Sequence, residues 1–153
     1  MTLVRVPDRP GIAARIMRAI ARQGVNVDMI VQNVSHGGLT DISFTVPKTD
    51  LHEAMVVLEK IGDEVGAGEV LADQEIAKVS LVGAGMKSSP GIAARMFRVL
   101  ADEGVNIEMI STSTIRISVV IPTADVERAA RALHSAFGLD SGQAYSAPLP
   151  ERK

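Results

Sequence analysis

One stretch of the sequence occurs twice. Residues 10–30 read PGIAARIMRAIARQGVNVDMI, and residues 90–110 read PGIAARMFRVLADEGVNIEMI. At a fixed offset of 80 residues, 13 of these 21 positions are identical. This indicates two copies of one supersecondary unit. Each copy occupies about half of the 153 residues, so its own core is expected to be marginal and to need packing against a second unit or chain.

Both copies have the same predicted order of elements. In the first copy we expect strands at residues 3–6, 25–34, 40–46 and 69–75. We expect one helix from residue 12 that stops at Gly24, a second from Asp50 through Ile61, and a loop at 62–68. In the second we expect strands at 78–82, 105–112, 115–121 and 143–146, and helices at 92–101 and 123–137. Asp50 with Glu53 forms a capping-box pattern, and Thr123 is the expected cap of the last helix.

The order β-α-β-β-α-β predicts an α+β protein of two tandem ferredoxin-like domains, each an antiparallel four-stranded sheet with both helices on one face. The expected domains are residues 1–75 and 76–147, followed by a tail at 148–153. Alternation along the strands places Ile30, Ile110 and Val120 on the face without helices. Because exposed apolar groups are costly, that face or the sheet edges should meet another unit, which predicts a dimer.

Composition excludes several classes of function. The net charge is −2 and aromatic residues make up 3% with no Trp, which argues against a nucleic-acid or anionic-membrane surface. There is no Cys and no apolar run of 18 residues, which excludes thiolate chemistry and a membrane span. The expected location is the cytoplasm.

No catalytic constellation is present. Gly83-Ala84-Gly85 begins a dinucleotide fingerprint, but Ser88 stands where the third glycine belongs. The three histidines have no ligand spacing among themselves. We therefore expect no catalytic residue, no metal and no cofactor on this chain.

The loop before the duplicated helix is the stronger candidate for a site. A helix N-terminus offers free backbone N–H groups and a partial positive charge to a carboxylate. In an amino-acid zwitterion, Asp8 could bind the α-ammonium group, and Asn26 and Gln32 could form hydrogen bonds with the other polar groups. The residues needed to bind an amino acid are therefore present. The alternative is that Pro10-Gly11 only starts the helix and Asn26 only stabilises a turn.

Two short motifs resemble the ACT domain, a small amino-acid-sensing module: DRPG at residues 8–11 and VNVDMI at 25–30. Longer runs resemble the paired ACT regulatory region of aspartate kinase: QNVS at 32–35, TDISF at 40–44, KVSLVGAGMKS at 78–88 and ISTSTIRIS at 110–118. The resemblance extends from about residue 4 to residue 139.

The resemblance implies a regulatory subunit or regulatory fragment of aspartate kinase, with ACT domains that form a homodimer and a separate catalytic kinase chain as partner. In that family, threonine or lysine binds where ACT units meet and feedback-inhibits the phosphorylation of aspartate. Two other readings stay open: a module that only assembles the kinase, and a stand-alone ACT sensor.

By position, the resemblance implies two effector sites. The first would use Asp8, Gly11, Ile12, Ala13 and Gln32, facing Asn106 and Ile107 of a partner chain. The second would use Met86, Ser88 and Gly91, facing Asn26 and Val27, with Ser113 nearby. Two positions depart from the family's pattern: Ala93, where some relatives have Thr, and Thr114, where Glu is usual.

Overall fold

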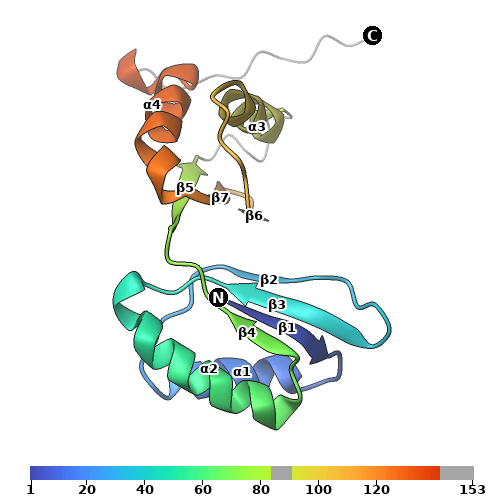
Figure 1. Cartoon of the computed structure of the whole chain (residues 1–153). Helices are drawn as coiled ribbons and strands as arrows, with labels where there is room; N and C mark the ends of the chain where they lie inside the picture. Colours follow the sequence, from blue (N-terminus) through green and yellow to red (C-terminus); the bar gives the residue numbers. More distant parts are fainter. Residues whose placement is uncertain (84–90, 142–153) are drawn as a thin grey trace. The chain divides into compact units, whose positions relative to one another are not determined.

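The computed structural model describes residues 1–83 and 91–141 (Figure 1). The chain divides into two compact units, Met1–Gln74 and Glu75–Lys153, and each is described by itself.

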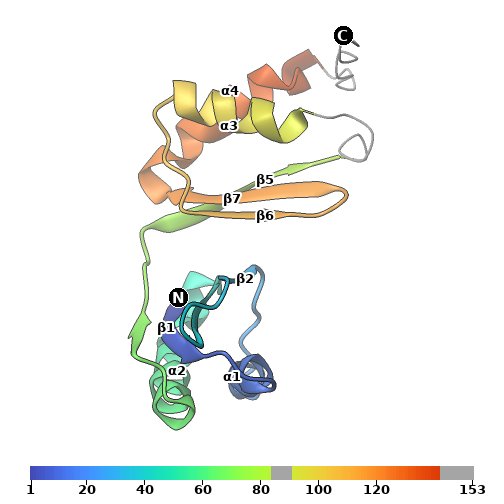
Figure 2. The same ribbon diagram turned by 90° about the vertical axis from the view of Figure 1, so that its right-hand side faces the viewer.

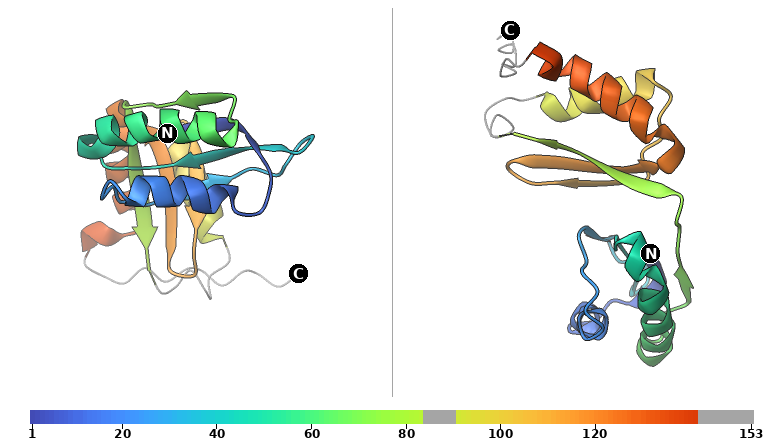
Figure 3. Two further views of the ribbon diagram at one scale, coloured as in Figure 1. Left: turned by 90° about the horizontal axis from the view of Figure 1, so that it is seen from below. Right: turned by 90° about the vertical axis from the view of Figure 1, so that its left-hand side faces the viewer.

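Unit 1 is a four-stranded antiparallel sheet with two helices. Its elements are β1 (Thr2–Pro7), α1 (Ile12–Ala21), β2 (Ile30–Gln32), β3 (Leu39–Phe44), α2 (Leu51–Val65) and β4 (Glu69–Leu71). The strand order is β2-β3-β1-β4, and all three neighbouring pairs are antiparallel. This is the ferredoxin-like order, and α1 and α2 lie side by side on one face of the sheet (Figure 3).

Unit 2 repeats this arrangement. Its elements are β5 (Ile76–Val82), α3 (Ile92–Asp102), β6 (Met109–Thr112), β7 (Arg116–Pro122) and α4 (Val126–Ala136). Within the described residues the sheet order is β5-β7-β6, and both helices lie on one face (Figure 2). The predicted strand at 143–146 and the tail at 148–153 lie outside the described residues. The predicted fold class, tandem ferredoxin-like α+β domains, is confirmed.

Each unit has a core between its sheet and its helices. In unit 1 the strands contribute Leu3, Val6, Ile42 and Phe44, and the helices contribute Ile16, Ile20, Ala54 and Leu58. In unit 2 the corresponding set is Ile117, Val119 and Ile121 with Met96, Leu100, Ala129 and Leu133. The apolar positions recur every second residue in the strands and every third or fourth in the helices, which explains why these segments form these elements.

The second helix of each unit does not begin as the sequence predicts. α2 and α4 each follow a single 3₁₀ turn, Lys48–Asp50 and Thr123–Asp125, and neither helix start in the described chain has a side-chain cap. The expected capping box at Asp50 is therefore wrong, because its carboxylate accepts the Thr49 hydroxyl at 2.8 Å. The expected Thr123 cap is also wrong, because Thr123 lies in the 3₁₀ turn, one turn before α4.

Helix α2 continues beyond the predicted loop start at Gly62 and ends at Val65, with Gly66 at φ 77° closing it. Gly62 faces the sheet: a Cβ there would lie 3.2 Å from Cγ2 of Val70 in β4. The glycine therefore lets the helix approach β4 closely and does not terminate it.

The edge strands are shorter than predicted, and their faces are reversed. Only residues 30–32 and 109–112 of the predicted strands 25–34 and 105–112 pair in the sheets. Ile30 pairs with Phe44 and Ile110 with Val119, so these side chains share the helix-covered face. The prediction that these two lie on the other face is wrong, because residues 25–29 and 105–108 are not strand and the alternation does not continue through them. Val120, between the core residues Val119 and Ile121 of β7, lies on the other face as predicted. Ile30 and Ile110 are 53% and 45% exposed at the two edges.

Within the described part of the chain, no helix has both the length and the apolar character that a bilayer span requires.

Candidate functional site

The loop between β1 and α1 lies against the β2–β3 hairpin. The Asp8 backbone N–H donates to the Gly38 carbonyl at 2.9 Å. Gly11 caps α1 with φ 92°, and its carbonyl accepts the Arg15 N–H at 3.0 Å. A left-handed residue at this point is what turns the loop into the helix, which explains the glycine.

The first turn of α1 leaves backbone donors open. Among the described residues, no acceptor bonds the N–H groups of Ala13 and Ala14, no side chain caps the helix, and the first turn has no acidic residue. These amides and the helix dipole together form a site suited to a carboxylate. Asp8, Gly11, Ile12 and Ala13 are thus brought together at one end of α1.

Gln32 lies on the same side of the sheet as α1. It pairs with Ile42, a core residue, so its side chain shares the helix-covered face, and as part of the edge strand it is exposed. Gly38, which bonds Asp8, is four residues from Ile42 along the hairpin, about 13 Å at strand spacing. Asp8 and Gln32 therefore lie at different points along the hairpin.

Asn26 and Val27 lie beyond the other end of α1. The helix has 10 residues, so about 15 Å of helix separates them from Gly11. Asn26 is exposed and Val27 half-buried, and the next amide, Asp28 N–H, donates to the Thr45 carbonyl at 3.1 Å. Within unit 1 the two predicted half-sites are therefore not brought together.

In unit 2 the predicted site residues also lie at opposite ends of the first helix. Gly91 caps α3 with φ 97°, and Asn106 is exposed beyond the far end of the helix. Ile107 is half-buried, and the following Glu108 N–H donates to the Val120 carbonyl at 2.9 Å. Two further predicted residues, Met86 and Ser88, lie outside the described residues.

Ser113 forms hydrogen bonds within the tight turn between β6 and β7. Its N–H donates to the Arg116 carbonyl at 2.7 Å, and its hydroxyl accepts the Ile115 N–H at 3.4 Å. These bonds give Ser113 a structural role in the turn, and its role as an effector contact stays a prediction.

One feature near Gln32 has no signal in the sequence. Strand β1 carries a bulge at Arg5, whose φ is 55°, and the Arg5 N–H donates to Oδ1 of Asp41 at 2.8 Å. The bulge lines a cavity of about 280 Å³ beside the hairpin, together with Asn33, His36 and Thr40. Arginine does not favour positive φ, so only the pairing of β1 with β3 reveals this bulge.

No group of three His, Cys, Asp or Glu side chains among the described residues is arranged to hold a metal ion.

Comparison with known proteins identifies a family and relatives that match this chain. The ACT domain family matches residues 4–61 and 79–137. An aspartate kinase of Stutzerimonas stutzeri is 52% identical over 141 residues, which cover 92% of this chain and 34% of the relative. An aspartokinase of Corynebacterium glutamicum is 50% identical over 141 residues, which cover 91% of this chain and 34% of the relative.

Solved structures of similar length match along most of their chains. The ligand-free regulatory subunit of aspartate kinase from Thermus thermophilus has a TM-score of 0.83 and 46% identity, over 89% of both chains. A crystal structure of aspartokinase alpha and beta subunits gives a TM-score of 0.82 and 47% identity, again over 89% of both chains.

This chain spans about a third of the length of the curated kinases it matches, and nearly all of the regulatory subunit. The resemblance seen in the motifs is confirmed. The chain belongs to the ACT domain family, as a tandem pair of the kind found in the regulatory region of aspartate kinase.

Proposed function

We propose that this chain is a regulatory subunit or regulatory fragment of aspartate kinase. It binds an end-product amino acid, threonine or lysine, where ACT units of two chains meet, and so feedback-inhibits the phosphorylation of aspartate by a catalytic chain in the cytoplasm. One observation carries the proposal: each unit has its two half-sites at opposite ends of its first helix, about 15 Å apart.

A side-by-side pair of units joins such half-sites. When two edge strands meet around a twofold axis they run in opposite directions, so the far end of one unit meets the near end of the other. Pairing β2 of one chain with β6 of another would bring Asn106 and Ile107 to the loop of Asp8 and Gly11. The same operation would bring Asn26 and Val27 to Gly91.

The chemistry of the joined site fits a zwitterion. The open N–H groups of Ala13 and Ala14 suit the α-carboxylate, and the Asp8 carboxylate suits the α-ammonium group. Gln32, on the same side of the sheet, is then available to the side chain of the bound amino acid, together with the partner's Asn106.

Regulation follows from a preference of the effector for one arrangement of units. An effector that contacts both chains stabilises the arrangement in which its two half-sites meet. A coupling of about 1–3 kcal/mol between this site and the kinase domain corresponds to a 5- to 150-fold change in affinity.

Calorimetric titration of the chain with threonine and with lysine tests the proposal. We expect saturable heat with at least one of them, and affinity at least about tenfold weaker in Asp8→Ala and in Gln32→Ala, since each loses a bond to a charged or polar ligand group. Glu53→Ala, an exposed change on α2, is the matched control and should bind as the parent does. Absence of heat with both amino acids would favour a purely assembling role.

A further inference from the structure

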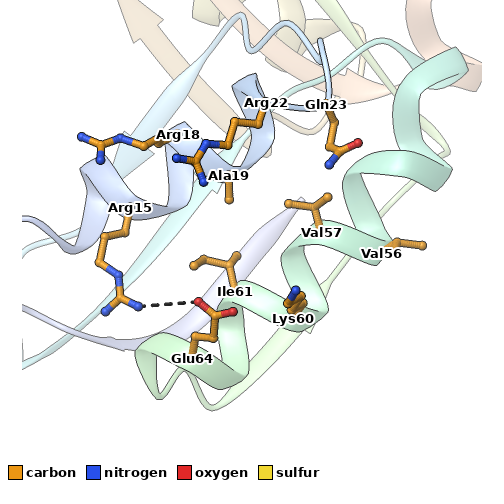
Figure 4. Close-up of a pocket in the computed structure, with 10 residues that line it drawn as sticks. All are labelled: Arg15, Arg18, Ala19, Arg22, Gln23, Val56, Val57, Lys60, Ile61 and Glu64. Carbon is orange, nitrogen blue, oxygen red and sulfur yellow. Dashed lines mark ion pairs between the residues drawn. The ribbon is translucent and has the colours of Figure 1, made fainter.

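The two helices of unit 1 enclose a groove on their outer surface. It has a volume of about 470 Å³ and is lined by Arg15, Arg18 and Arg22 from α1 and by Val57, Lys60 and Ile61 from α2 (Figure 4). The floor is apolar and the rim is cationic. None of the described residues proposed to bind the effector lines this groove.

Most of the positive charge at the groove is not neutralised. Arg15 pairs with Glu64 at 3.6 Å across the two helices. Within the described parts of the chain, no carboxylate forms an ion pair with Arg18, Arg22 or Lys60. Val56, at the lip, is 57% exposed. The groove thus combines three uncompensated cations with exposed apolar surface.

Comparison with unit 2 indicates that the fold does not require this charge. α1 and α3 match at an offset of 80 residues, so Arg22 corresponds to Asp102. α2 and α4 match at an offset of 75, which aligns the buried residues Leu58 and Leu133, and Lys60 then corresponds to Ser135.

The matched surface of unit 2 keeps part of this charge, because Arg95 and Arg98 stand at the positions of Arg15 and Arg18. Arg131, which stands at the position of Val56, pairs with Glu127 on α4 at 3.5 Å. Two copies with equivalent cores therefore differ in charge at the matched positions through Arg22 and Lys60. A solvated helix face would explain the arginines that both copies share, whereas Arg22 and Lys60 add positive charge in unit 1 alone.

We propose that the α1/α2 groove of unit 1 is a docking site for an acidic, amphipathic segment of the catalytic chain. This rests on the proposed function for the identity of the partner. Arg15, Arg18 and Arg22 follow one another at i, i+3 and i+7, which spans about 10 Å of helix. A row of that length matches several acidic side chains along a peptide segment, whereas a single phosphate or carboxylate contacts one or two of these cations.

The apolar floor adds a requirement for the partner. Val57 and Ile61 lie between the cations of α1 and Lys60 (Figure 4). A segment with acidic residues on its flanks and aliphatic residues between them satisfies both the rim and the floor, as amphipathic helices do in hydrophobic grooves. The charged rim is expected to govern the association rate and its salt dependence.

The test compares variants of the full chain in complex with the catalytic kinase chain. We expect the Arg18→Glu/Arg22→Glu double variant to bind the catalytic chain at least about tenfold more weakly and with a smaller salt dependence. The milder Arg18→Gln/Arg22→Gln pair should shift affinity in the same direction. Arg98→Glu, at the equivalent of Arg18 in unit 2, is the matched control and should bind as the parent does. Binding is read by interferometry at several salt concentrations.

The same variants are titrated with threonine and lysine, which separates this proposal from the proposed function. Loss of docking with unchanged effector heat supports the groove as the docking site. Equal binding of the catalytic chain by parent and double variants, or no binding by the parent, overturns it, while the effector titration judges the regulatory function separately. If the groove binds inorganic pyrophosphate but does not bind the catalytic chain, it is a small-anion site. This outcome also overturns the docking proposal.

Discussion

At the scale of single residues, Gly11 and Gly91 carry the candidate sites. Both stand at the start of a duplicated helix with φ above 90°, a conformation that side chains other than glycine adopt only with strain. Among the described residues, apart from the chain neighbours of each glycine, no atom lies within 4 Å of where a Cβ would stand at either position. Backbone conformation, and not space, therefore explains the glycine.

Gly11→Ala is expected to lower the free energy of unfolding by about 1–2 kcal/mol, because the alanine must adopt a left-handed conformation. Gly83→Ala is the control: its backbone is not left-handed and a Cβ there would meet no atom of the described residues within 4 Å, so its effect should stay within about 0.5 kcal/mol. Urea unfolding followed by circular dichroism measures both. An equal effect of the two changes would contradict the argument from φ.

At the scale of elements, α2 and α4 show how a helix can be held by its packed face without a side-chain cap. Both begin from a 3₁₀ turn, and both bury an alanine and a leucine at equivalent positions. In α2 these are Ala54 and Leu58, each completely buried against the sheet. Their burial stabilises the helix more than a cap would, since a cap contributes about 1 kcal/mol.

Leu58→Ala should therefore destabilise the protein by about 2–5 kcal/mol, the usual cost of a cavity in a packed core. Val56→Ala, two residues away on the exposed side of the same helix, should change stability by less than about 0.5 kcal/mol. Chemical denaturation of both variants provides the comparison. A small effect at Leu58 would mean that the core of unit 1 relaxes to fill the space.

At the scale of the whole molecule, the edges of the two sheets are the surfaces most in need of a partner. β2 and β6 are edge strands within the described sheets, and each exposes an isoleucine, Ile30 and Ile110, on the helix-covered side. An exposed strand edge with apolar side chains favours pairing with another strand. We expect the pairing to occur between two copies of this chain.

The Ile30→Glu/Ile110→Glu double variant should then shift the protein from dimer toward monomer, because each change places a charge at the paired edge. Leu71→Glu, on the opposite edge strand β4 and also exposed, is the control and should leave the dimer intact. Light scattering after size exclusion at micromolar concentration measures the mass. A parent protein that is monomeric under these conditions would exclude the homodimer.

Much of the architecture is encoded locally. The duplication, the apolar periods and the glycines predict both helix pairs, the βαββαβ order of elements and the loop that precedes α1. These features depend on residues close in the sequence, where burial repeats with the period of a helix or a strand. The motifs around Asp8 and Gln32 likewise indicate the ACT family from the sequence alone.

By itself, the sequence determined the repeated βαββαβ plan and the family. Only the tertiary structure decided that Ile30 and Gln32 share the face of α1, that Arg5 forms a bulge held by Asp41, and that cations collect in one groove of unit 1. These features arise from pairing between residues far apart in the chain. A local pattern states how often a side chain is buried, but the partner strand or helix decides which face it occupies.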